Sequence, residues 1–266
     1  MRDHEIIVDS INILGKYLAK RDILELNQNC LQESYGFRQA DLLILFGGSI
    51  PYGCDVAARG FLNGIAKNMM IAGGAGHTTD FLRRAVHDKY PDIATEGRME
   101  ADIMADYLKC KYGIENLYLE RHSTNCGNNV SYALDEVRKN ELPHESVIVI
   151  QDSTLQMRMD ATFKKTWKDE HTTLVHYAPY IVEVVEKDGS IQYQEPIPWG
   201  MWSMEQYITL LLGEIPRLRD DENGYGPKGQ NYLIHMDVPT EVVNAFEILR
   251  GKYADSVRVA NPKFKS

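Results

Sequence analysis

Short apolar runs alternate with longer amphipathic segments through most of the chain. The apolar runs are DLLILF (41 to 46), NMMIA (68 to 72), NLYLE (116 to 120), SVIVI (146 to 150) and TLVHYA (173 to 178). Near-continuous apolar runs are typical of strands that are buried on both faces, and their alternation with helical segments indicates βαβ units. The pattern therefore predicts an α/β fold with a three-layer, Rossmann-like and mostly parallel sheet of about five strands.

Within the intervening segments, apolar residues recur at helical spacing and define the stripe of each helix that faces the sheet. In the segment 125 to 139 this stripe comprises Val130, Ala133, Leu134 and Val137. One turn earlier the stripe reaches Asn129, and Glu100 and Gln156 begin the stripes of two other helices in the same way. Since helix beginnings in a parallel sheet lie beside the carboxyl ends of the strands, we expect these three polar side chains at one sheet edge.

The residues before and after the alternating region do not follow the βαβ pattern. Helices that pack on the core are expected in 1–36, and the Rossmann-like domain is expected in 37–180. A smaller, mainly helical region is expected in 181–266, where it forms a layer beside the sheet edge together with the amino-terminal helices.

Three elements are predicted within the carboxyl-terminal region. The dipeptide Asp188-Gly189 separates two stretches of alternating acidic and apolar residues and indicates a β-hairpin. Apolar residues at helical spacing then predict an amphipathic helix that ends at Pro216. A final helix is predicted near 239 to 251.

Composition and charge narrow the class of partner. Of the 266 residues, 44% are hydrophobic and 25% are charged, as in an ordinary globular protein. The net charge of -9 argues against nucleic acid and against an anionic membrane surface, because both attract clustered Lys and Arg. The sequence shows no signal peptide, no spanning apolar run and no zinc-like cysteine spacing, so we expect a reduced, cytoplasmic protein that binds a small molecule. The oligomeric state is left open.

Each of the first four predicted strands is followed by a loop that is rich in small and polar residues. The loops are GGSIPYG (47 to 53), GGAGHTT (73 to 79), ERHSTNCGNN (120 to 129) and QDSTLQMR (151 to 158). Because parallel strands end at the same edge, we expect these loops and the N–H groups of the following helices to form one ligand-binding crevice. The alternative for each loop taken alone is structural, with glycines in tight turns and serines as helix N-caps.

The residue types in these loops give two groups of candidate site residues. Glycines let a ligand approach the backbone, while hydroxyl, amide and charged side chains hold it. The candidates for ligand binding are Gly47, Gly48, Ser49, Gly73, Gly74, Gly76, His77, Glu100, Ser123, Ser153, Gln156 and Arg158. The candidates for substrate contact or catalysis are Glu120, Asn125, Asn129 and Asp152. No metal is expected, because the histidines lack the spacing of metal ligands.

Glu120 closes the third predicted strand, and its carboxylate is expected to face the crevice among neutral hydrogen-bonding partners. A desolvated carboxylate there has a raised pKa and can act as a general base, whereas an ionised one can hold a cationic ligand group. Trp199 and Trp202 have two interpretations, as core residues or as an aromatic wall of the site.

Common cofactor and catalytic motifs do not occur in the sequence. The first strand-to-helix turn lacks the G-x-G-x-x-G fingerprint of NAD-binding proteins, and neither GxxxxGK[ST] nor GxSxG is present. The second predicted strand ends in Gly73 and Gly74 rather than in the acid that grips the ribose in common methyltransferases.

The ordered motifs LFGG, IAGGAG, LYLERHSTNCGNN and VIQDSTLQMRMDA resemble the bacterial family of unknown function that includes SanA, ElyC and YdcF. The resemblance covers roughly residues 40 to 180. The positions that match the third loop of the family are Glu120, Ser123, Asn125 and Asn129.

The chain also departs from the pattern of that family. Cys126 stands where the third loop has a threonine, and Asn128 stands where it has a glutamate. In the fourth loop, Gln156 replaces a histidine and Arg158 lies one position early. An acid–base mechanism based on that histidine is therefore not expected here.

The resemblance implies a nucleotide-utilising α/β protein, and the YdcF type within the family implies binding of S-adenosyl-L-methionine. We therefore expect a cytoplasmic protein that binds this cofactor and, if it is an enzyme, a transferase that uses it. Two alternatives stay open. One is a transferase or hydrolase that acts on a phosphorylated or envelope-linked metabolite, and the other is a noncatalytic metabolite sensor whose helical layer closes over the ligand.

Overall fold

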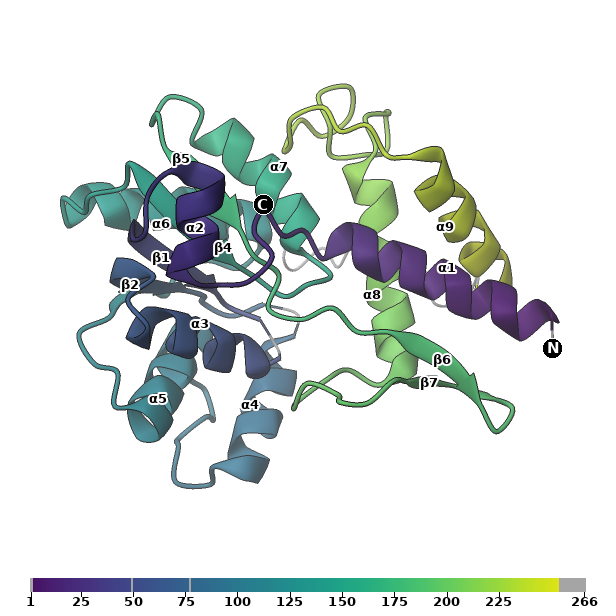
Figure 1. Ribbon diagram of the computed structural model, residues 1–266, viewed down its shortest axis with the longest axis horizontal. Helices are drawn as coiled ribbons and strands as arrows, with labels where there is room; N and C mark the ends of the chain where they lie inside the picture. Colours follow the sequence, from purple (N-terminus) through teal and green to yellow (C-terminus); the bar gives the residue numbers. More distant parts are fainter. Residues whose placement is uncertain (1, 49, 77, 254–266) are drawn as a thin grey trace.

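The computed structural model describes residues 2–48, 50–76 and 78–253, and its centre is a parallel β-sheet (Figure 1). In this described part, five strands lie in the order β3-β2-β1-β4-β5. The strands are β1 (Ala40–Phe46), β2 (Ala66–Ala72), β3 (Tyr118–Glu120), β4 (Ser146–Ile150) and β5 (Thr173–His176). The predicted α/β fold with a parallel sheet of about five strands is therefore confirmed.

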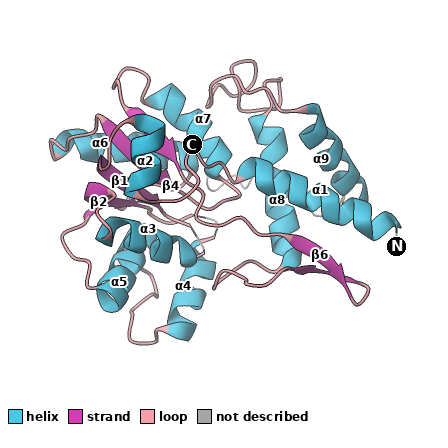
Figure 2. Cartoon of the chain, in the orientation of Figure 1, coloured by secondary structure: helices cyan, strands magenta, loops and turns pink. Residues whose placement is uncertain are grey.

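Helices cover both faces of the sheet, as Figure 2 shows. They are α2 (Gln28–Tyr35), α3 (Tyr52–Leu62), α4 (Thr79–Lys89), α5 (Glu100–Tyr112), α6 (Cys126–Lys139) and α7 (Gln156–Thr166). Leu43 and Leu45 of β1 pack with residues of α3 and α5, whereas Leu42 and Ile44 pack with residues of α6 and α7. Strand β1 is buried along its whole length because apolar helices cover both of its faces.

The helical stripes expected from the sequence are buried. The stripe of α6 belongs to the apolar cluster on one face of the sheet and consists of Val130, Ala133, Leu134 and Val137. Glu100 and Gln156 are the first residues of α5 and α7, and both are buried. The periodicity of the sequence therefore identifies the faces of these helices correctly.

A second apolar core joins the first helix to the carboxyl-terminal elements. These elements are α1 (Arg2–Leu18), β6 (Val184–Lys187), β7 (Ser190–Tyr193), α8 (Met204–Leu218) and α9 (Thr240–Lys252). Helix α1 lies alongside α9 (Figure 1), and Leu14 of α1 shares a cluster with Leu211 of α8 and Phe246 of α9. Leu31 of α2 belongs instead to the core of the sheet. The two amino-terminal helices therefore pack in different cores, α1 with the carboxyl-terminal elements and α2 with the sheet.

The hairpin and the helices predicted for this region are present, with one difference. Strands β6 and β7 pair antiparallel across Asp188 and Gly189, whose φ angles of 53° and 76° fit a tight hairpin turn. Helix α8 continues through Pro216 to Leu218, so the predicted end at Pro216 is wrong. Among the described residues, no helix has both the length and the apolar character needed to cross a bilayer.

The strand register brings the carboxyl ends of the strands to one edge. Phe46 of β1 pairs with Ala72 of β2, and Ala72 pairs with Glu120 of β3. On the other side, Leu45 of β1 pairs with Ile150 of β4. The loops after these strands therefore start side by side. The strand order reverses its direction between β1 and β4, which makes this place a topological switch point.

Candidate functional site

A cavity of about 1060 Å³ lies at this edge, bounded by the sheet loops and by α8. Its walls are the loops that follow β1, β2, β3 and β4, the helices α7 and α8, and the segment 223–233. The β1 and β4 loops flank the switch point, which is where open α/β sheets bind their ligands. The structure therefore has a ligand-sized cavity at the edge where the sequence predicts a crevice.

Most of the predicted site residues come together on the wall of this cavity. Those that line it are Gly47, Gly48, Gly74, Gly76, Glu100, Ser123, Asn125, Asn129, Asp152 and Arg158. Four predicted site residues are described by the structure but do not line the cavity, namely Gly73, Glu120, Ser153 and Gln156. Two further predicted residues, Ser49 and His77, lie outside the described residues.

Gly73 and Gly74 meet a steric demand of the chain itself. A Cβ atom on Gly73 would lie 2.8 Å from the backbone of the β1 loop, and one on Gly74 would lie 2.7 Å from the carbonyl oxygen of Arg121. The close contact between neighbouring loops therefore requires glycine at both positions, which favours the structural alternative for them over ligand approach. A Cβ on Gly76 would meet only the carbonyl oxygen of Thr124, at 3.4 Å, so Gly76 is the least crowded of the three.

Glu100 presents a carboxylate to the cavity from the start of α5. Its Oε1 accepts a hydrogen bond from the hydroxyl of Thr79 at 2.7 Å, and that hydroxyl accepts one from the N–H of Gly76 at 2.7 Å. Burial raises the pKa of Glu100 to about 7, while the Thr79 bond and the charge of Arg83 act in the opposite direction. At neutral pH this carboxyl group can therefore accept or donate a proton at the cavity wall.

The carboxylate of Glu120 is turned into its own loop. Its Oε1 accepts hydrogen bonds from the N–H groups of His122 at 2.5 Å and Ser123 at 3.0 Å. Its Oε2 is buried and has no hydrogen-bond partner among the described residues. Glu120 therefore does not line the crevice as expected, because its carboxylate is hydrogen-bonded to backbone N–H groups of the same loop. It holds the loop in which the Ser123 hydroxyl accepts a bond from the N–H of Gly74 at 3.1 Å.

Asp152 lines the cavity, but both of its carboxylate oxygens already accept hydrogen bonds. Oδ1 accepts from the N–H of Thr154 at 2.9 Å and from its hydroxyl at 2.6 Å, and Oδ2 accepts from Tyr180 at 3.0 Å and Trp202 at 3.4 Å. Burial raises the pKa of Asp152 against these bonds. The Ser153 hydroxyl donates to the Tyr180 carbonyl at 2.5 Å. Both side chains therefore stabilise the β4 loop through hydrogen bonds within the protein. This geometry does not favour a catalytic role for Asp152 or a ligand-binding role for Ser153.

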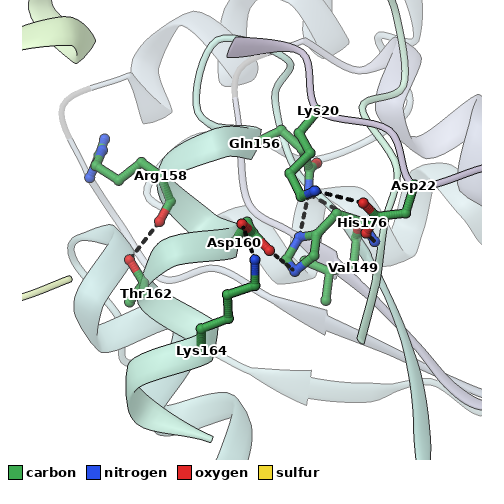
Figure 3. A network of polar contacts seen from close by, with 9 residues as sticks. All are labelled: Lys20, Asp22, Val149, Gln156, Arg158, Asp160, Thr162, Lys164 and His176. Atoms are coloured by element: carbon green, nitrogen blue, oxygen red, sulfur yellow. Dashed lines mark hydrogen bonds and ion pairs between the residues drawn. The ribbon is translucent and has the colours of Figure 1, made fainter. Parts of the chain in front are cut away.

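Gln156 belongs to a buried polar network beneath the β4 loop (Figure 3). Its Oε1 accepts from the N–H of Gln151 at 2.8 Å, and its Nε2 donates to Nδ1 of His176 at 3.0 Å. The Nε2 of His176 lies 3.4 Å from Asp160, and burial lowers the pKa of His176 to about 4. Gln151 in turn donates from its Nε2 to the carbonyl of Gly47 at 3.1 Å. Gln156 thus supports the loops from below and is not a ligand contact.

Asn125 and Asn129 lie at the first turn of α6 and have different partners. The Oδ1 of Asn125 accepts from the N–H of Asn128 at 3.0 Å, which makes Asn125 the N-cap of the helix. Asn129 is 9% exposed and lines the cavity, and its side chain forms no hydrogen bond with another described residue. An amide that faces a cavity without a partner is suited to bind a ligand, so Asn129 is the better placed of the two.

Arg158 lies on the cavity wall and pairs with Glu214 of α8, which is not among the predicted site residues. Its Nε and Nη2 donate to the two carboxylate oxygens of Glu214 at 2.6 and 3.0 Å. Arg217 of α8 and Lys165 of α7 also line the cavity. These residues meet only because α8 packs against α7. One signal was present in the sequence, since Glu214 is an acid within the apolar run of α8.

The two tryptophans have different environments. Trp202 is buried, lines the cavity and packs on Phe81 with ring centroids 4.4 Å apart. Trp199 donates from Nε1 to Asp55 at 2.6 Å and does not line the cavity. Trp202 is therefore a wall residue, and Trp199 is a packing residue.

The fold and the cavity define an α/β protein with a Rossmann-like parallel sheet and a ligand-sized cavity at its carboxyl edge. No protein-family model matches the chain. Within residues 2–48, 50–76 and 78–253, no group of three His, Cys, Asp or Glu side chains is arranged to hold a metal ion.

Proposed function

We propose that this chain is a cytoplasmic protein that binds S-adenosylmethionine in the cavity at the carboxyl edge of the sheet. The observation that carries the proposal is the position of the cavity. The β1 and β4 loops line it on either side of the switch point, which is where nucleotide ligands bind in folds of this type. The choice of S-adenosylmethionine among nucleotide-type ligands rests on the resemblance of the loop motifs to the SanA, ElyC and YdcF family.

Three kinds of group hold the ligand in this proposal. Gly76 lines the cavity without a side chain, so a flat part of the ligand can lie against it, and the ring of Trp202 offers an apolar wall. Glu100 accepts hydrogen bonds from ribose hydroxyls or attracts the ammonium of the methionine part when it is ionised. The amide of Asn129 can both donate and accept a hydrogen bond.

A second candidate function is catalysis on a phosphorylated metabolite by a transferase or hydrolase, and one observation favours it. Burial raises the pKa of Glu100 to about 7, where a carboxylate is effective as a general base at neutral pH. A transferase that uses S-adenosylmethionine would unite the two functions, with Glu100 removing a proton from the acceptor.

Isothermal titration calorimetry on the purified chain tests the proposal. We expect S-adenosylmethionine and S-adenosylhomocysteine to bind and NAD not to bind. Asn129→Ala is expected to weaken S-adenosylhomocysteine at least about tenfold, or about 1.4 kcal/mol. Asn140→Ala is the matched control, because Asn140 caps the other end of α6 and does not line the cavity. Binding of a nucleotide or sugar phosphate, without binding of either adenosyl compound at millimolar concentration, would contradict the proposal and favour the second candidate.

A further inference from the structure

Helices α7 and α8 pack against each other and place three cations on the cavity wall. Arg158 and Lys165 lie on α7, and Arg217 lies on α8 beside Glu214. No other Lys or Arg among the described residues lines the cavity, so all of its basic side chains come from this pair of helices. We call Arg158, Lys165, Glu214 and Arg217 the α7–α8 subsite.

The α7–α8 subsite carries more positive than negative charge. Glu214 neutralises Arg158 through its two hydrogen bonds and lies 3.7 Å from Arg217. Lys165 donates to the carbonyl and side-chain oxygens of Asn231, which are neutral. In the described part of the chain, Arg217 has no other carboxylate partner and Lys165 has none. One carboxylate therefore faces three cations on the same wall.

Arg217 keeps hydrogen-bonding capacity in this arrangement. Its Nη1 donates to the carbonyl of Gly213, whereas no described residue accepts from its Nε or Nη2. The centre of the Tyr225 ring lies 5.9 Å from the guanidinium carbon. Two N–H donors on a planar cation match the oxygens of a phosphate or a carboxylate. Because a charge that is removed from water needs a partner, this geometry indicates an anionic ligand group.

The cavity is large for a pocket that holds a single ligand. Its volume of about 1060 Å³ slightly exceeds the range of roughly 300 to 1000 Å³ that is typical of a pocket for one drug-sized molecule. The sheet-edge residues Glu100, Gly76 and Asn129 belong to α5, the β2 loop and α6, whereas the α7–α8 subsite belongs to other elements. Two groups of lining residues from different elements therefore share one cavity.

We infer that the α7–α8 subsite binds the oxyanion of a second substrate, a phosphate or a carboxylate group, in the same cavity as the nucleotide-type ligand. Arg217 and Lys165 contact the anion. Arg158 and Glu214 form the buried pair beside which Arg217 is held. The description of this molecule as a second substrate rests on the proposed function, whereas the oxyanion site itself does not.

Isothermal titration calorimetry with inorganic pyrophosphate and with malonate separates the phosphate from the carboxylate source. Each anion is titrated with and without S-adenosylhomocysteine. We expect one of the anions to bind, and Arg217→Gln and Lys165→Gln each to weaken it at least about tenfold, while S-adenosylhomocysteine stays within about twofold. Lys164→Gln is the matched control. Lys164 is also on α7, but it does not line the cavity. Its Nζ lies 2.9 Å from Asp160, and Figure 3 shows that Arg158 points away from this Lys164–Asp160 pair.

Three results would overturn the inference. In the first, neither anion binds to the native chain. In the second, the anion binds equally to the native chain and to all variants. In the third, the Arg217 and Lys165 variants lose affinity for S-adenosylhomocysteine but not for the anion. If an anion binds through Arg217 and Lys165 but S-adenosylhomocysteine does not bind, the oxyanion site stands and the proposed function fails. Thermal unfolding checks that each variant is folded, and if Arg217→Gln is not, Lys165→Gln alone decides the test.

Discussion

Glu100 and Glu120 are both buried at the carboxyl edge of the sheet, but only Glu100 lines the cavity. The carboxylate of Glu120 accepts hydrogen bonds from two backbone N–H groups in the loop that follows β3. The carboxylate of Glu100 instead accepts a hydrogen bond from the hydroxyl of Thr79. Position at a strand or helix end therefore does not by itself make an acid a binding residue. The backbone donors within its reach decide whether its carboxylate stabilises a loop or faces a ligand.

Gly74 connects these two regions, and its replacement is expected to have the largest effect. Its carbonyl accepts from the N–H of Glu100 at 2.8 Å, and its N–H donates to the hydroxyl of Ser123. In Gly74→Ala the new Cβ would lie 2.7 Å from the carbonyl oxygen of Arg121, so the loops must separate. We expect the free energy of unfolding, measured by urea denaturation, to fall by about 4 kcal/mol.

Gly76→Ala is the control for this prediction. Its Cβ would meet only the carbonyl oxygen of Thr124, at 3.4 Å, which is close to an ordinary contact. We expect this variant to lose less than about 1 kcal/mol. Equal stability of the two variants would show that the loops around Glu100 and Glu120 are not tightly packed on each other.

Glu100 is expected to make the stability of the protein depend on pH. Burial raises its pKa from 4.5 to about 7, so the folded protein holds a proton that the unfolded chain releases. The contribution of Glu100 to the free energy of unfolding is therefore greatest below about pH 4.5, falls by on the order of 3 kcal/mol as the pH rises through about 7, and then levels off. Glu100→Gln removes this dependence, and its stability relative to the native chain should increase between about pH 5 and pH 8 in urea denaturation series. A constant difference over that range would contradict the prediction.

Glu120→Gln is expected to have the smallest effect. The amide oxygen can still accept the bonds from His122 and Ser123, but a neutral acceptor is weaker than a carboxylate. We expect a loss of about 1 kcal/mol in the free energy of unfolding and an affinity for S-adenosylhomocysteine within about twofold of the native value. A tenfold loss of affinity at unchanged stability would instead place Glu120 in the binding site.

The sheet could be predicted from the sequence because a strand that is buried on both faces consists of a near-continuous run of apolar residues. Every residue of β1 is buried, and the alternation of such runs with helical stripes determines the layers. The hairpin could be predicted because Asp188-Gly189 adopts the positive φ angles that its turn needs. The end of α8 could not, because Leu218 is buried in the second core and packing extends the helix past Pro216.

The candidate site could be predicted only where topology determines it. Glu100 and Asn129 lie at helix beginnings beside strand ends, so the fold class alone brings them to the cavity. The orientation of Glu120 depends on hydrogen bonds within its own loop, which periodicity does not reveal. Glu214 and Arg217 join the site through the packing of α8 on α7, and no local pattern specifies that contact.

The hydrogen bond from Gln151 to the carbonyl of Gly47 crosses the switch point and ties the β1 loop to the β4 loop. Gln151 is itself fixed, because its Oε1 accepts from the N–H of Asp152 at 2.6 Å and Gln156 accepts from its N–H. The floor of the cavity is therefore pre-organised, and a ligand that settles there orders little of the chain. Affinity at this floor then reflects the contacts themselves rather than a cost of ordering the two loops.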